Sequence, residues 1–267
     1  MTGRTLVDAA TMLRRSLRRM RRYPSLTLFI AGIPVVLLLL FVYVFGGTLG
    51  AGLLGTATPA ADREVYLAYI VPGILLITVA GAAQGTAISV AMDMTQGIIA
   101  RFRTMAIARA SVLAGHVIGS VIQAMLAIAV VMAVALAIGF RPTTGPLAWA
   151  GAGALLALTA VAVGWLSVAL GLVTDSVETA SNLPMFLTLL PFLSSGFVPT
   201  DTMPAPLAWF AEHQPFTPII ETLRGLLLGT PTGSSGLVAV AWCVVISVAG
   251  YAWARRLYER VPARVAG

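Results

Sequence analysis

Six long stretches of this 267-residue chain contain no Asp, Glu, Lys or Arg, and they constrain the fold more than any other feature. The shortest holds 22 residues and the longest 39. A helix needs about 20 apolar residues to cross the ~30 Å hydrocarbon layer of a membrane, so each stretch is long enough to cross. Charged residues make up only 10% of the chain, against about 25% in soluble domains. We predict an all-α polytopic membrane protein with six transmembrane helices.

The positions of these stretches define the predicted spans and connections. The spans cover residues 25–45, 66–92, 110–140, 146–173, 183–198 and 237–253. We expect an outer loop at 46–61, a tight outer turn at 141–145 and a cytoplasmic connection at 174–182. Small residues such as Gly81 and Gly85 predict that the second span packs against protein. The membrane domain is thus predicted at 25–254, preceded by an amphipathic segment at 1–24 and followed by a basic tail at 255–267.

The basic residues indicate the orientation of the chain. All 17 are Arg, and only Arg63, Arg141 and Arg224 fall on one side of the deduced membrane. By the positive-inside rule, the N- and C-termini are predicted to be cytoplasmic. Because most of the Arg residues lie on one side of the membrane, the net charge of +7 does not require a nucleic-acid partner. An all-Arg composition is typical of GC-rich genomes, so we expect the plasma membrane of an actinobacterium.

The N-terminal segment has the pattern of a helix that lies in the membrane interface. Leu13, Leu17 and Met20 continue an apolar stripe at helical spacing, and Arg14 and Arg18 flank it. Such a helix places its apolar stripe in the acyl boundary and its guanidinium groups near anionic lipid head groups. A solvated helix is the alternative. Tyr23-Pro24 would then turn the chain into the membrane.

Residues 199–236 form a different kind of segment, because prolines and charged residues alternate with apolar ones. This stretch is too polar to span and too apolar to lie free in water. We expect short helices at about 206–212 and 217–228, on or dipping into the outer side of the bundle. Irregular backbone at membrane depth is tolerated only where protein or water surrounds it.

The sequence carries few groups that could perform chemistry. A chain without Lys has no conventional phosphate-binding P-loop, so we expect no bound cofactor and assign ATP chemistry to a partner. The single Cys243 and two scattered His exclude a familiar zinc site. Ser195 with His213 or His116 is the one enzyme-like set, but helix packing and a loop or interfacial His explain these residues better. We expect no catalytic residue and no metal ligand.

Polar groups within the spans are also scarce. They are Gln84, His116 and Gln123, and no carboxylate lies at membrane depth. Proton-coupled transport normally uses such carboxylates. An amphipathic or lipid-like cargo therefore fits the spans better than a bare ion.

The cytoplasmic loop at 93–109 contains a second amphipathic pattern. Ile98, Phe102 and Met105 are spaced for one face of a short helix, and Arg101 and Arg103 lie off that face. An apolar helix face on the cytoplasmic side suits a socket in another protein. A helix that only anchors the loop in the interface is the alternative.

Two parts of the chain resemble a known family. The segment 182–229, which contains Ser194-Ser-Gly-Phe-Val-Pro199, Pro215-Phe-Thr-Pro218 and Glu221-Thr-Leu-Arg224, looks like the C-terminal signature of ABC-2 type exporter permeases of the daunorubicin-resistance class. The loop Gly97-Ile-Ile-Ala-Arg-Phe-Arg-Thr-Met105 is similar to the first cytoplasmic loop of that family.

The resemblance implies a permease that dimerises with itself or a related permease and exports amphipathic drugs, polyketides or lipids. Two copies of a separate cytoplasmic ATPase subunit would hold ATP and Mg²⁺. The segment 1–24 would be the elbow helix and 206–228 the outer re-entrant helices. The coupling helix would fall at about 96–105, and its candidate contacts are Gly97, Ile98, Ile99, Arg101, Phe102, Arg103 and Met105.

Residues of the second and fifth spans and of the outer segment are candidates for the translocation route and the outer gate. They are Gln84, Phe186, Phe192, Phe197, Glu212, His213 and Glu221. An ATP-independent carrier or channel remains an alternative function, and an intramembrane hydrolase that uses Ser195 is a second one.

Overall fold

The computed structural model describes residues 24–54, 59–96, 109–174 and 176–260, and every regular element in them is helical. Five of the described helical stretches are long and apolar enough to cross a membrane. The first consists of α2 (Pro24–Leu40), a π-helical turn (Phe41–Phe45) and α3 (Gly46–Leu54). The other four are α4 (Pro59–Thr95), α6 (Arg109–Ala137), α7 (Pro146–Val173) and α12 (Ser235–Arg260).

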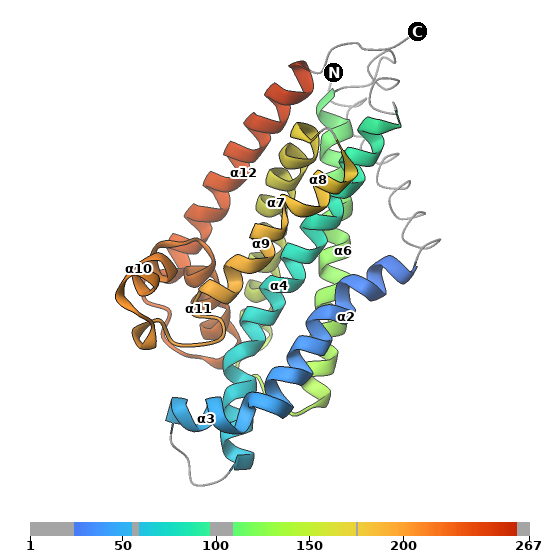
Figure 1. Cartoon of the computed structure of the whole chain (residues 1–267). Coiled ribbons are helices and arrows are strands. Elements are labelled where there is room, and N and C mark those ends of the chain that lie inside the picture. The colour runs from blue at the N-terminus through green and yellow to red at the C-terminus, as the bar shows by residue number, and fades with distance from the viewer. Residues whose placement is uncertain (1–23, 55–58, 97–108, 175, 261–267) are drawn as a thin grey trace.

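Helix α4 lies in the middle of the bundle, with α12 and α2 at opposite edges (Figure 1). It packs against α2, α6 and α7, and Ile70, Ile74 and Leu75 on it are fully buried. The prediction that the second span packs against protein is confirmed. The edge helices instead expose apolar side chains, among them Val36 on α2 and Val248 on α12.

The prediction of an outer loop at 46–61 is wrong for most of that range, because α3 continues the first span to Leu54 and α4 already begins at Pro59. The glycines that suggested a loop serve close packing instead. A Cβ at Gly50 would overlap the backbone carbonyl of Asp62, and one at Gly46 would lie 3.1 Å from the Arg63 side chain. These glycines let α3 lie directly against the first turns of α4.

The fifth predicted span is not a continuous long helix. Residues 177–193 form α8 (Val177–Asn182), α9 (Met185–Leu189) and a 3₁₀ turn (Leu190–Leu193). Pro184 and Pro191 lie at the junctions, where a missing N–H and the ring interrupt a helix. The short helices follow one another along α4 (Figure 1). We call residues 177–193 the broken segment.

Two short helices, α10 (Ala205–His213) and α11 (Phe216–Leu228), lie where the sequence predicted them. The tight turn between α6 and α7 contacts the end of α11: the hydroxyl groups of Thr143 and Thr144 donate to the carbonyls of Leu228 and Leu226, at 2.8 and 2.6 Å. These bonds satisfy carbonyls that a helix end leaves unpaired. We call α10 and α11 the cap, the bundle end near it the cap end, and the opposite end, where α4 stops at Thr95, the loop end.

Candidate functional site

The predicted contacts with the ATPase, from Gly97 to Met105, lie outside the described residues. So do Leu13, Arg14, Leu17, Arg18 and Met20 of the predicted elbow helix. What the structure describes is the pair of helix ends that flank the loop. Helix α4 ends at Thr95 and α6 begins at Arg109.

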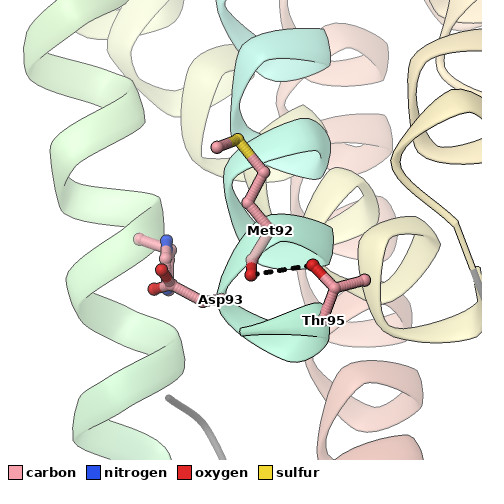
Figure 2. A network of polar contacts seen from close by, with 4 residues as sticks. Met92, Asp93 and Thr95 are labelled. Carbon is pink, nitrogen blue, oxygen red and sulfur yellow. Dashed lines mark hydrogen bonds and ion pairs between the residues drawn. The ribbon is translucent and has the colours of Figure 1, made fainter. Parts of the chain in front are cut away.

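A polar contact between an Asp and a His, an ion pair when the His is protonated, joins these two helix ends. Oδ2 of Asp93, on α4, lies 3.3 Å from Nε2 of His116 on α6, and both side chains are largely shielded from solvent. Figure 2 shows Asp93 at the end of α4, where the Thr95 hydroxyl donates to the carbonyl of Met92 at 3.1 Å. The sequence suggested an interfacial role for His116 but not its partner. The signal was present: Asp93 is the first charged residue after the second uncharged stretch.

Apolar packing around this ion pair joins four helices. Val90 of α4, Leu113 and Val117 of α6, Leu172 of α7 and Tyr258 of α12 belong to one buried cluster. The ends of α4 and α6, residues 90–96 and 109–117, are therefore held to the rest of the loop end. We call these two helix ends the loop stem.

Glycines bring the backbones together near the stem. A Cβ at Gly171 of α7 would lie 2.6 Å from the carbonyl oxygen of Ala87, and one at Gly250 of α12 would lie 2.9 Å from the backbone nitrogen of Leu166. Real Cβ atoms do not approach backbone so closely. The loop end is therefore packed with little room for adjustment.

The start of the broken segment also contacts α4 near the loop end. Nε2 of Gln84 donates to the Ser181 carbonyl at 2.8 Å, so this predicted route residue joins α4 to α8. Ser176 caps α8 by accepting a hydrogen bond from the Thr179 N–H at 3.2 Å.

At the cap end, Arg224 of α11 connects three parts of the fold. Its Nη2 donates to the Ser195 carbonyl at 2.9 Å and to the Tyr69 carbonyl of α4 at 3.3 Å. Its guanidinium carbon lies 4.0 Å from the centre of the Tyr69 ring, within the range of a cation–π interaction. This role of Arg224 was not predicted from the sequence. A lone Arg in the apolar run from Phe216 to Leu228 was the available signal.

No carboxylate of the described residues forms an ion pair with Arg224. Glu221, one turn earlier on α11, instead accepts a hydrogen bond from the Ser235 hydroxyl of α12 at 2.7 Å. Arg224 therefore holds the cap through backbone carbonyls and an aromatic face. Such contacts can be released without separating a buried pair of opposite charges.

The structure brings together two of the three predicted gate aromatics. Phe192 stacks on Phe197, with ring centres 4.8 Å apart, and Phe41 of the π-helical turn also packs on Phe197, with ring centres 5.0 Å apart. Phe186 lies apart from this group and is 69% exposed. The aromatic group connects the first span to the broken segment beside the cap.

Glu212 and His213 are exposed on α10, away from the buried contacts of Arg224. His213 stacks on Trp209 at 4.7 Å between ring centres, and its Nδ1 lies 2.7 Å from the Trp209 carbonyl oxygen. The Ser195 hydroxyl is buried and has no hydrogen-bond partner in the described part of the chain. Because no bond joins Ser195 to His213, the described geometry contains no Ser–His pair for a hydrolase.

Within the described residues, no group of three or more His, Cys, Asp or Glu side chains could hold a metal ion. The described sites are instead two helix junctions at opposite ends of an apolar bundle. The family model for ABC-2 type transporters matches residues 8–228.

The chain belongs to the ABC-2 type transporter family. It is 30% identical over 247 residues to a daunorubicin resistance ABC transporter permease protein of Streptomyces coeruleorubidus, covering 88% of this chain and 84% of that protein. It is 25% identical over 202 residues to a probable doxorubicin resistance ABC transporter permease protein of Mycobacterium tuberculosis, covering 73% and 72%.

This ABC-2 chain is a transmembrane subunit of an ABC exporter, as the sequence resemblance predicted. Proteins of this family associate with an ABC ATPase. The Streptomyces and Mycobacterium relatives agree with the predicted actinobacterial plasma membrane.

Proposed function

We propose that the chain is one of two permease protomers of an exporter for amphipathic drugs, polyketides or lipid-like molecules. Two copies of a cytoplasmic ATPase would bind ATP and Mg²⁺, and this chain would bind no cofactor. The second protomer would be another copy or a related permease. The resistance relatives support a drug-like cargo, and the absence of carboxylates from the middle of the described spans agrees with it.

The broken segment would be the fifth of six membrane crossings. Its 17 residues from Val177 to Leu193 run along α4, and a continuous α-helix of that length would extend about 25 Å, against ~30 Å for the hydrocarbon layer. Six crossings place both termini on one side, and the Arg distribution makes that side cytoplasmic. The loop end is then cytoplasmic, the cap is outer and re-entrant, and 1–24 is the elbow helix in contact with lipids.

The loop stem would transmit ATPase movements into the bundle. Phe102 and its apolar neighbours in the 97–105 loop would dock into the ATPase, and the Asp93–His116 ion pair would make α4 and α6 move together. Helix α4 also reaches the cap, because the Tyr69 carbonyl accepts from Arg224. This continuous connection through α4 is the observation that carries the proposal.

The cap would close the exit of the route in the state described by the structure. Arg224 holds α11 on α4 and on the turn at Ser195, and the Phe192–Phe197 pair fills the space beside it. Export would require these contacts to separate while the loop stem stays intact. Glu212 and His213, on the exposed surface of α10, would lie at the outer mouth.

Transport by a reconstituted complex tests this function. The permease and the ATPase that co-purifies with it would be placed in lipid vesicles, and ATP hydrolysis and daunorubicin transport would be measured. We expect Phe102→Asp to abolish both ATPase association and transport, because it places a charge in an apolar contact. Thr230→Asp, on the exposed turn after α11, is the matched control and should leave both unchanged. Transport without any ATPase would instead establish a carrier.

A further inference from the structure

A small apolar cavity lies inside the fold, separate from the loop stem and from the contacts of Arg224. Its volume is about 120 Å³. Four elements surround it: α7, the broken segment, the start of α11 and α12. The walls include Thr159, Ala162, Leu187, Phe216, Cys243 and Ile246.

The one hydroxyl group in the cavity wall, that of Thr159, already has a hydrogen-bond partner. The Thr159 hydroxyl donates to the Leu155 carbonyl at 2.8 Å, and the sulfur of Cys243 lies 3.5 Å from it. Every other side chain of the lining is apolar or a thiol. A water molecule needs two to four polar partners, so this cavity is dry when empty.

The cavity lies on the bundle-facing side of α12. Cys243 is 1% exposed and faces the bundle, whereas Val244, Val245 and Val248 of α12 are exposed. Less than two turns further along α12, Gly250 touches the backbone of α7. The space therefore opens between helices that are otherwise in close contact.

We propose that this cavity binds a single aromatic ring of the carried molecule. An apolar cavity of ~150 Å³ is known to hold one benzene molecule, and the cavity here, at about 120 Å³, is close to that size. The broken segment forms one wall through Leu187 and Leu190, so its movement during transport would open and close the site. This inference rests on the proposed function for the identity of the molecule, but not for the binding of a ring.

The single cysteine of the chain allows the cavity to be measured directly. The exporter complex in lipid vesicles would be treated with N-ethylmaleimide, and alkylation of Cys243 would be followed by mass spectrometry of the intact chain. We expect benzene to slow the alkylation at least about threefold, because a bound ligand protects the occupied fraction of sites. A rate that benzene leaves unchanged would overturn the proposal, and a lipid tail already in the cavity would give that result.

A filled cavity provides the second arm. Ala162→Leu places a larger side chain in the cavity, and we expect it to remove the effect of benzene. Ala154→Leu is the matched control, since Ala154 lies on the exposed face of α7, and it should keep the effect. If Ala162→Leu unfolds the protein, alkylation would accelerate, and the benzene arm on the unmodified chain still decides.

Daunorubicin then tests whether the ring belongs to the carried molecule. If the complex transports daunorubicin, the drug should slow Cys243 alkylation as benzene does. Protection by benzene but not by transported daunorubicin would contradict the assignment to cargo. A complex without ATP-driven transport would contradict the proposed function, while the benzene experiment would still report on the ring site.

Discussion

The loop end and the cap end of this permease are held together by different means. At the loop end, long helices meet backbone to backbone at Gly171 and Gly250, and the Asp93–His116 ion pair joins α4 to α6. At the cap end, short helices are held mainly by side chains: Arg224 bonds carbonyls and packs on one aromatic ring, and Thr143 and Thr144 bond the end of α11. One close backbone contact, between Gly73 and Gly196, adds to them. Under the proposed function, the loop end would move as a unit and the cap end would separate.

The largest effect should come from Gly171→Leu at the loop end. The new side chain would overlap the backbone of α4 at Ala87 and the side chain of Val90, neither of which can move aside cheaply. We expect loss of most of the folded protein, measured as the monodisperse fraction after extraction. Gly153→Leu is the matched control on the same helix, because nothing lies within 4 Å of a Cβ there. Equal yields of the two variants would contradict close packing at the loop end.

Arg224→Met should have the next largest effect, and it should act on transport more than on folding. The change removes two hydrogen bonds from a charged donor, worth about 2 kcal/mol each, but keeps most of the side-chain volume. We expect ATP hydrolysis to continue while transport falls by about tenfold or more. Arg141→Met, on the exposed turn between α6 and α7, should change transport little. A loss of hydrolysis and transport in equal measure would indicate general unfolding.

His116→Leu should have a smaller effect, confined to the coupling between ATPase and cap. It removes the ion pair with Asp93 while the apolar cluster around Leu113 and Val117 keeps the stem folded. We expect transport per ATP hydrolysed to fall by about threefold, consistent with about 0.7 kcal/mol of coupling energy. Gln123→Leu, further along α6, is the control for a polar-to-apolar change. An unchanged ratio would show that the ion pair plays no part in coupling.

The smallest effects should distinguish the aromatic residues of the broken segment. Phe192→Ala removes the stacking on Phe197 and should lower the midpoint of thermal unfolding by a few degrees, for about 1 kcal/mol of lost stacking. Phe186→Ala removes an exposed ring and should leave the midpoint unchanged. The unfolding midpoints of the two variants would be measured in the same detergent. A lower midpoint for Phe186→Ala alone would reverse the assignment.

The long spans could be predicted from the sequence because their length and lack of charge follow from the thickness of the membrane. The second, third, fourth and sixth uncharged stretches each contain a long helix, and short helices lie at 205–228 as expected. The predictions were wrong where the same local composition is compatible with two different structures. The glycines at 46–50 suggested a loop but allow close packing against α4. The apolar stretch at 183–198 suggested one continuous span, but its prolines interrupt the helix.

The candidate sites were less predictable, because their contacts join residues that are distant in the chain. Arg224 meets Tyr69 across 155 positions, and no spacing rule reveals such a pair. Asp93 and His116 lie on different predicted elements, so each was considered alone. Among the expected gate residues, Phe192 and Phe197 are in contact, but Phe186, Glu212 and His213 lie apart from them.

Distance measurements between spin labels test whether the cap end separates while the loop end stays together. In a Cys243→Ser background, one pair of labels at Thr95 and Glu259 would report on the loop end, and another at Leu147 and Trp209 on the cap end. All four positions are exposed. During ATP turnover by the complex, we expect the first distance to change by less than about 2 Å and the second by more than about 5 Å. A large change at the loop end with a constant distance at the cap end would contradict the account.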